Sequence, residues 1–284
     1  MNVLPNAHMA TKAFLLREFW ISWWYISSSR GGMSRAKKTT KNNMVKHSMK
    51  KTNLVSPTKE NLDTLIPLGL LANIYKNVIA TDTSPKQLEF ADKLPNIRYK
   101  CTSPNMSMSE LQENIGSESS VDLVTIAQAM HWFDLPIFYQ QVKWVLKKPN
   151  GVIAAWCYTV PEVNPSVDSL FQRFYTIDAG PYWESPRRFV DEKYETIDFP
   201  FQPVDGLEHN GPFRFNSEKL MDLEGYFTYL KSWSAYQTAK GKGVELLTDK
   251  VVEDFKKAWN EDGKIEKIVI FPVYLRIGKV GSSN

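Results

Sequence analysis

The chain has 284 residues, a length typical of one large domain or of two domains of roughly 100 to 200 residues each. Its 43% hydrophobic and 23% charged residues exclude a chain that is disordered throughout. The two cysteines, Cys101 and Cys157, exclude a disulfide framework and a four-thiolate zinc site. Because both cysteines lie in apolar runs, we expect buried thiols in a reduced, cytoplasmic protein.

The formal net charge of +4 is distributed unevenly along the chain. Residues 1–76 hold 12 Lys and Arg against 3 Asp and Glu, and residues 77–284 hold the remaining 23 basic and 28 acidic residues. The basic character therefore belongs to one end of the sequence and indicates nothing about the partners of the main body. We expect an atypical basic segment over residues 1–70 and a separate domain over residues 71–284.

The N-terminal segment contains one apolar run, residues 13–25, which is shorter than the about 20 residues of a bilayer span. Charged residues interrupt this run, so we expect no stable membrane insertion. An interfacial contact through its tryptophans and a transit peptide remain open alternatives. Residues 28–60 show no periodicity and are predicted to be largely disordered, so their removal together with the preceding residues is expected to leave stability unchanged. No aromatic residue is interleaved with the basic tract over residues 30–60, so we expect no nucleic-acid partner.

From residue 75 onward, apolar strands alternate with amphipathic helices. The pattern predicts strands over residues 77–81, 97–101, 121–127 and 152–156, and helices over residues 85–93, 109–115 and 135–145. Ser84 and Ser109 are the expected N-caps of the first two helices. Strands and helices at this spacing predict a Rossmann-like α/β fold, doubly wound around a mostly parallel sheet.

The pattern loosens after residue 161. Residues 167–175, 218–240 and 251–259 are predicted to be helices, so residues 161–265 form a helical region rich in aromatic side chains. Residues 268–280 predict a closing strand, antiparallel to the others. Pro272 lies inside it and indicates an edge position or a bulge, because proline has no N–H group to donate to a ladder.

Two groups of side chains follow predicted strands, where an open parallel sheet binds its ligands. Asp82 ends the first of these strands, and its carboxylate could accept both hydroxyls of a ribose or merely cap the next helix. The sequence QAMHWFD, residues 128–134, follows the third strand and could serve a ligand or pack in the core. The residues alone leave both alternatives open.

Three motifs in this order resemble the class I S-adenosylmethionine-dependent methyltransferases. VIATDTSPKQL resembles the strand whose terminal acid holds the cofactor ribose, SVDLVTIAQAMHWFD the segment beneath the methionine end, and VLKKPNGVIAAW the turn and strand that follow. HWFD and SWSAYQ are similar to a plant and fungal small-molecule branch related to trans-aconitate methyltransferases. The resemblance covers about residues 72–280 and implies S-adenosylmethionine as cofactor.

The resemblance also implies roles for individual residues. Asp82 would hold the ribose and Thr83 would flank it, while Met106 would lie near the adenine. Gln128 and Ala129 would line the adenosyl–sulfonium region. On the acceptor side, His131 and Trp132 would face the acceptor, with His131 a candidate general base. Residues 161–265 would form the lid, with these candidates to contact the substrate: Tyr175, Tyr182, Trp183, Trp233 and Tyr236.

The acceptor implied by this branch is a small molecule, with a carboxylic acid as one candidate. Arg187, Arg188 and Arg214 could pair with an acidic acceptor. We expect no metal site, and we expect a monomer or a weak homodimer.

One part of the family pattern is missing. Family members open with a strand that runs into a glycine-rich loop, which lets the backbone approach the cofactor closely because glycine has no Cβ. Upstream of Asp82 the chain has only Gly31, Gly32 and Gly69, none of them in such a loop. We therefore expect an incomplete domain that lacks the usual first strand, with residues 53–57 and 64–71 as the only candidates to replace it. A catalytically inactive or truncated relative thus remains an alternative, and so does a nicotinamide-dependent dehydrogenase.

Overall fold

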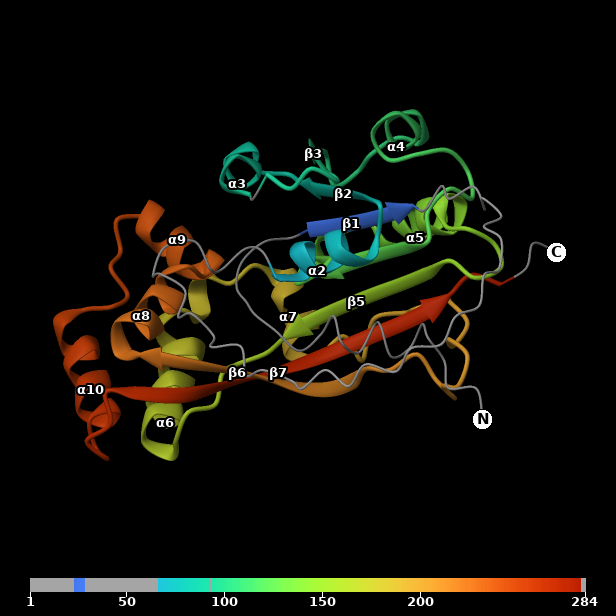
Figure 1. The fold of residues 1–284 in the computed structure, drawn as a ribbon. Helices are drawn as coiled ribbons and strands as arrows, with labels where there is room; N and C mark the ends of the chain where they lie inside the picture. The colour runs from blue at the N-terminus through green and yellow to red at the C-terminus, as the bar shows by residue number, and fades with distance from the viewer. Residues whose placement is uncertain (1–22, 29–65, 92, 282–284) are drawn as a thin grey trace, which may run out of the picture.

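The computed structural model describes residues 23–28, 66–91 and 93–281. Its centre is a seven-stranded sheet in the order β3-β2-β1-β4-β5-β7-β6 (Figure 1). The strands are β1 (Trp23–Ser28), β2 (Asn77–Asp82), β3 (Ile97–Cys101), β4 (Leu123–Ala127), β5 (Val152–Tyr158), β6 (Phe213–Asp222) and β7 (Glu266–Lys279). Strands β2 to β6 run in one direction, and β1 and β7 run in the other. The α/β Rossmann-like fold predicted from the sequence is confirmed.

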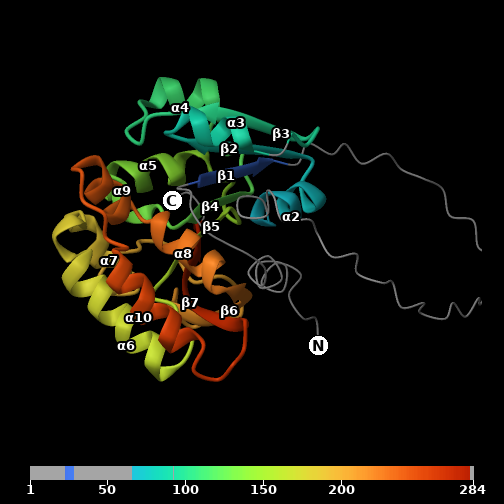
Figure 2. The same cartoon turned by 90° about the vertical axis from the view of Figure 1, so that its left-hand side faces the viewer.

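Helices cover both faces of the sheet, with α2 on one side and α5 on the other (Figure 2). The helices are α2 (Ile66–Ile74), α3 (Pro85–Phe90), α4 (Met108–Asn114), α5 (Leu135–Val145), α6 (Pro165–Arg173), α7 (Arg188–Asp191), α8 (Leu223–Lys231), α9 (Ser234–Gly241) and α10 (Asp249–Trp259). Short turns add η1 (Met130–Trp132), η2 (Phe174–Asp178), η3 (Gly180–Tyr182) and η4 (Ser185–Arg187).

The helix starts follow local capping chemistry. Ser84 accepts a hydrogen bond from the backbone N–H of Gln87 and so caps α3, as the sequence predicts. The predicted cap of α4 is wrong, because Ser107 and not Ser109 begins that helix. Ser107 and Glu110 form a reciprocal capping box, which satisfies two backbone N–H groups that Ser109 would leave open.

Strand β1 occupies the central position that the sequence left vacant. Trp24 pairs with Thr81 of β2 on one side and with Ile126 of β4 on the other, both in antiparallel register. Neither predicted replacement fills this position: residues 66–74 form α2, and residues 53–57 lie outside the described residues. Residues 1–60 contribute the strand that joins the two halves of the sheet, which argues against the expectation that their removal leaves stability unchanged. Residues 23–25 of β1 are the end of the apolar run over residues 13–25, from which the sequence predicts no strand.

Because β1 is antiparallel to β2 and β4, it begins at the carboxyl edge of these strands and ends at their amino edge. Its first residue, Trp23, pairs with Ala127 at the carboxyl end of β4. Its last residue, Ser28, pairs with Asn77 at the beginning of β2. The chain therefore leaves β1 at the edge opposite to the carboxyl ends of β2 and β4, whereas an open sheet of this kind binds its ligands at the carboxyl edge.

The C-terminal third departs from the predicted helices. Residues 213–222 form β6, so the predicted helix over residues 218–240 begins only at α8 and is interrupted before α9. The side chains of β6 alternate between exposed and less exposed, as expected of a strand, but the sequence does not show this period, since Leu220 is exposed and Lys219 is less exposed. Strand β7 is antiparallel as predicted, but it lies between β5 and β6, so the predicted edge position of Pro272 is wrong.

The sheet tolerates Pro272 because the N–H that proline lacks would point toward β5 and not toward β6. Its carbonyl accepts from the backbone N–H of Thr159, just past the point where the β5–β7 ladder ends at Tyr158. In a strand the N–H and C=O of one residue point to the same side. The missing donor therefore faces the end of the ladder and leaves the pairing with β6 intact.

Two large apolar clusters hold the molecule together. One packs β4, β5 and α5 against residues 190–201. The other is mainly aromatic and joins α6, α8, α9 and α10 to the ends of β6 and β7. These helices gather at the end of the sheet toward which β5 points, so the aromatic cluster adjoins the carboxyl edge (Figure 1).

Candidate functional site

Asp82 is a buried carboxylate at the carboxyl end of β2. Its residue is only 5% exposed, and its Oδ1 accepts from the backbone N–H of Ser84 at 2.6 Å. Burial raises the pKa of Asp82 to about 6, against the lowering effect of backbone hydrogen bonds from Ser84 and Thr83. No side chain among the described residues donates to this carboxylate. It is therefore a desolvated acceptor that lacks side-chain donors, which suits a site for ligand hydroxyl groups.

Gln128 begins the segment after β4, and its side chain is fully used inside the protein. Its Nε2 donates to the carbonyl of Tyr158 at 3.2 Å, and its Oε1 accepts from the Tyr158 backbone N–H at 2.8 Å. The backbone of Gln128 is left-handed, with φ of 53°. The side chain thus ties the end of β4 to the end of β5, and the surface left for a ligand is that of the backbone.

The other expected cofactor residues differ in exposure. Thr83 is exposed, and Ala129 is completely buried directly after Gln128. Met106 is buried beside α5, where its carbonyl accepts from the side chain of Gln141. The backbone thus brings Asp82, Thr83, Gln128 and Ala129 to one edge of the sheet, and Met106 lies in the core behind it.

His131 lies in η1 with its ring almost fully buried. Its Nδ1 is 2.9 Å from the hydroxyl oxygen of Tyr194. Burial lowers the pKa of His131 to about 3, and the positive charge of Arg187 lowers it further. The ring is therefore uncharged at neutral pH, and its basicity is too low for an effective general base.

Arg187 is the charged group that faces this histidine from η4. Its Nε donates to the Tyr175 hydroxyl at 2.9 Å and lies 3.5 Å from Oδ1 of Asp191. The Tyr175 hydroxyl in turn donates to Asp191 at 2.5 Å. Burial disfavours the charge on Arg187, but Tyr175 and Asp191 more than offset this and raise its pKa. The guanidinium is thus a positive charge that is held in place through its Nε atom.

Three of the expected acceptor residues meet around this arginine. The rings of Tyr175, Trp183 and Trp233 contact one another, with centroid separations of 5.1, 5.7 and 5.4 Å. The guanidinium carbon of Arg187 lies 4.8 Å from the Trp183 ring centre. Tyr236 is not part of this group, because its hydroxyl is bound to Glu245. The structure therefore brings together three of the five candidate substrate residues.

The remaining predicted residues are peripheral to this group. Trp132 is 37% exposed and stacks obliquely on His131, with the centroids 4.9 Å apart. Tyr182 is half-buried beside Lys242. Of the other arginines, Arg188 lies over Phe189 and Arg214 is 3.7 Å from Glu162, both on the surface.

Sequence reasoning missed Asp191 and Tyr194 and gave Arg187 no priority. No motif marks them, because η4, α7 and the residues after them form an irregular segment without hydrophobic periodicity. The sequence signal that could have found them is SPRRF, a pair of arginines after a proline turn. The cysteine expectation is half right: Cys157 is buried, but Cys101 is exposed at the end of β3.

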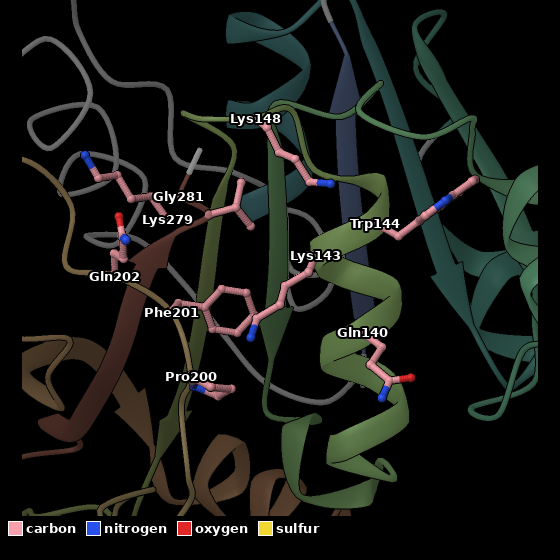
Figure 3. Close-up of a pocket in the computed structure, with 10 residues that line it drawn as sticks. Gln140, Lys143, Trp144, Lys148, Pro200, Phe201, Gln202, Lys279 and Gly281 are labelled. Atoms are coloured by element: carbon pink, nitrogen blue, oxygen red, sulfur yellow. The ribbon is translucent and has the colours of Figure 1, made fainter. Parts of the chain in front are cut away.

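A separate groove of about 610 Å³ lies along the C-terminal half of α5 (Figure 3). Lys143, Lys148 and Lys279 line it together with Phe201, and it shares no residue with the group around His131. Within the described ranges, no three His, Cys, Asp or Glu side chains are placed to hold a metal ion. No helix of the described part is long and apolar enough to cross a membrane.

Comparison with known proteins fits this geometry. The model of a family described as a methyltransferase domain matches residues 65–155. A Dictyostelium discoideum protein described as a methyltransferase is 31% identical over 214 residues, which is 74% of this chain and 76% of the relative. The chain belongs to the class I methyltransferase family. The plant and fungal branch expected from the sequence stays a prediction.

Two further similarities agree with this family membership. The Saccharomyces cerevisiae protein CRG1, described as an S-adenosylmethionine-dependent methyltransferase, is 34% identical over 95 residues, 31% of this chain and 30% of the relative. The solved structure of a type II methyltransferase from Anaeromyxobacter dehalogenans has a TM-score of 0.62 and 26% identity, covering 78% of this chain and 87% of that one. The cofactor of this methyltransferase family is S-adenosylmethionine, as the sequence predicts.

The described residues of this methyltransferase fit the adenosyl half of S-adenosylmethionine. Asp82 offers a buried carboxylate without side-chain donors, which suits the two hydroxyls of a ribose. The fully buried Ala129 follows a left-handed residue, so the backbone itself forms the wall beside this position. For the carboxypropyl end, β1 itself ends at the opposite edge, and the residues that follow it lie outside the described residues.

Proposed function

We propose that this methyltransferase transfers a methyl group to the carboxylate of a small-molecule acid. The observation that carries the proposal is the fixed guanidinium of Arg187 inside an aromatic group. Its Nε is engaged by Tyr175 and Asp191, whereas its two terminal nitrogens make no hydrogen bond to another described residue. Paired terminal nitrogens of arginine match the two oxygens of a carboxylate.

The surroundings of Arg187 favour an anionic acceptor with an apolar body. Tyr175, Trp183 and Trp233 surround the charge with rings, which exclude water and strengthen an ion pair. We propose that residues 161–265, which supply these rings, cover the acceptor as a lid.

The chemistry of a carboxylate acceptor matches the groups at this site. When bound, the cofactor supplies a methyl group on a positively charged sulfur, an electrophile for an oxygen lone pair. A carboxylate has no proton to lose, so no general base is required of His131. The residues of the chain contribute by orienting the acceptor and excluding water. Asp82, Thr83, Gln128, Ala129 and Met106 are proposed to hold the adenosyl part, and His131, Trp132, Tyr175, Trp183 and Trp233 to contact the acceptor.

Calorimetric titration with S-adenosylhomocysteine tests cofactor binding first. Micromolar affinity, about −8 kcal/mol, is expected for the wild-type chain and a large loss for Asp82→Ala. The matched control is Asp205→Ala, which removes an exposed carboxylate paired with Lys279. Equal affinity of the wild type and Asp82→Ala contradicts the role of Asp82.

An acceptor screen then tests the carboxylate. With mono- and dicarboxylic acids, phenols and amines offered in parallel, methyl ester formation is expected from the acids. Arg187→Met is expected to lower kcat/KM for the acid by roughly 10- to 100-fold, the value of a desolvated charged hydrogen bond. Arg188→Met, on the exposed neighbour, is expected to change little. Methylation of amines or phenols alone would refute the acid.

A second candidate function is a family member that binds no cofactor. The direction of β1 favours it, because the strand runs away from the carboxyl edge, at which the family's first strand meets its glycine loop. The titration separates the two: a folded chain that binds no S-adenosylhomocysteine supports the second candidate and excludes the first. The comparisons favour methyl transfer over the dehydrogenase alternative.

A further inference from the structure

Tyr194 is a completely buried residue that the proposed chemistry does not use. Its hydroxyl lies 2.9 Å from Nδ1 of His131, across 63 positions of sequence. The centroids of the two rings are 6.0 Å apart, so the residues interact through the hydrogen bond and not through ring stacking. A hydrogen bond between two buried rings fixes the orientation of both.

The backbone at Tyr194 is held in an unfavourable conformation. Lys193 and Tyr194 have φ of 58° and 59°, a left-handed region that residues with a Cβ seldom adopt. Arg276 of β7 stabilises this turn, because its Nη1 donates to the carbonyls of Tyr194 at 2.8 Å and of Ile197 at 3.1 Å. Strain that neighbouring residues maintain in this way is typical of positions that orient functional groups.

The direction of the hydrogen bond follows from the proton of the phenol and the acceptor within its reach. Burial raises the pKa of Tyr194, so the hydroxyl keeps its proton. Nδ1 of His131 is the only hydrogen-bond partner of this hydroxyl among the described residues, so the buried hydroxyl hydrogen would lack an acceptor if Nδ1 carried a proton. The hydroxyl hydrogen is left to donate, and Nδ1 of His131 is the acceptor within reach.

We propose that Tyr194 is a positioning residue that holds His131 in the tautomer with its proton on Nε2. A nitrogen that accepts a hydrogen bond carries no proton, so the imidazole proton must lie on Nε2. Nε2 makes no hydrogen bond to another described residue, so it is the nitrogen available to a ligand. The ring presents an N–H donor toward the acceptor site.

This inference rests on the proposed function in one respect, the identity of the acceptor. An Nε2–H donor complements Arg187, since one oxygen of a carboxylate can accept from the imidazole while the guanidinium binds the anion. The opposite tautomer would present a lone pair and repel an anionic oxygen. The tautomer itself, however, is a property of the free protein and can be measured without any substrate.

Nitrogen-15 NMR of the full chain measures the tautomer directly. The spectrum of the four histidines is recorded, and the signals of His131 are identified by their loss in His131→Gln. For the wild type we expect an unprotonated Nδ1 and a protonated Nε2. A protonated Nδ1 in the wild type overturns the proposal, whatever the acceptor is.

Two variants test whether Tyr194 is the cause. Tyr194→Phe keeps the ring and removes the donor, so we expect a mixture of both tautomers. The matched control is Tyr139→Phe, which removes another buried hydroxyl, bound to the carbonyl of Asp198, and should leave His131 unchanged. A wild-type tautomer ratio in folded Tyr194→Phe overturns the proposal. If that variant does not fold, the wild-type spectrum still decides the tautomer.

Kinetics then separate a positioning role from a merely structural one. With a turned-over acid, Tyr194→Phe is expected to lower kcat/KM for the acceptor about tenfold and to leave the KM for S-adenosylmethionine unchanged. A general loss of stability would instead affect both substrates. If no acid is turned over, the proposed function fails, and the NMR result on His131 stands independently.

Discussion

At the scale of single residues, the site combines two buried ionisable groups with opposite behaviour. Burial keeps His131 uncharged, whereas Arg187 retains its charge because Tyr175 and Asp191 stabilise it. Asp82 is also buried, but it accepts hydrogen bonds from backbone N–H groups alone. Its negative charge therefore lowers the stability of the folded protein. Residues that lower stability in this way are common where a ligand is to supply the missing partners.

We predict that the cost of Asp82 appears as a pH dependence of stability. Its pKa is raised from 3.8 to about 6 in the folded protein, so the folded state binds the proton more tightly than the unfolded state. The penalty is absent below about pH 4, grows as the pH rises through about 6, and then stays constant at about 2 to 3 kcal/mol. Asp82→Asn should remove it and stabilise the protein at pH 7.5 but not at pH 4.

Urea unfolding of wild type and Asp82→Asn at pH 4 and pH 7.5 measures this difference. Asp205→Asn serves as the control, since its exposed carboxylate pairs with Lys279 and lacks the burial penalty. The same stability difference between Asp82→Asn and wild type at both pH values would show that the buried carboxylate carries no such cost.

At the scale of elements, local signals in the sequence were sufficient where one helix or strand is decided by its own residues. The bounds of β3 and α5 are those predicted, and the Ser84 cap of α3 is confirmed. Predictions failed where tertiary pairing decides. Strand β6 exists because β7 offers a ladder over its full length, and β1 exists because β2 and β4 leave a gap between them. Neither partner is visible in a local window.

We predict that the stability of two alanine variants distinguishes the Ser107 cap of α4 from the Ser109 cap expected from the sequence. Ser107→Ala removes the acceptor of the Glu110 N–H and should lower stability by about 1 kcal/mol. Ser109→Ala, at the cap predicted from the sequence, should change stability by a few tenths at most. Urea midpoints of the two variants decide it, and a larger loss for Ser109→Ala would restore the original assignment.

We also predict that β1 is required for stability. A chain that begins at residue 23 keeps the strand, whereas one that begins at residue 30 loses it and leaves both β2 and β4 with unpaired edges. The shorter chain should unfold at a temperature lower by several degrees or become insoluble. Equal melting temperatures of the two chains would show that the sheet does not depend on β1.

At the scale of the whole molecule, the apolar cluster of the sheet could be predicted from the sequence, whereas the aromatic cluster could not. The sheet cluster follows from continuous apolar strands such as 123–127, which the sequence displays directly. The group around Arg187 is assembled from η2, the residue after η3, η4 and the turn before α9, all irregular segments, of which the last lies more than 40 residues from the others. Their association depends on packing between aromatic side chains, for which a single sequence has no readable code.

We predict that thiol reactivity reports global unfolding. Cys101 is exposed and Cys157 is buried in the sheet cluster, where burial raises the pKa of its thiol. A disulfide reagent should therefore modify one thiol per chain quickly in buffer and the second only in denaturant. Alanine at position 101 should abolish the fast phase. Fast modification of both thiols in buffer would show that the central sheet opens readily.

The reversed direction of β1 also has a practical consequence for anyone handling this protein. In a chain shortened to begin at Trp23, a fusion partner would be attached beside the carboxyl end of β4, the edge at which such sheets bind their ligands. Strand β7 ends at Lys279, opposite the first residue of β5, at the other edge of the sheet. Affinity tags and fluorophores therefore belong on the C-terminal side, where they leave the binding measurements undisturbed.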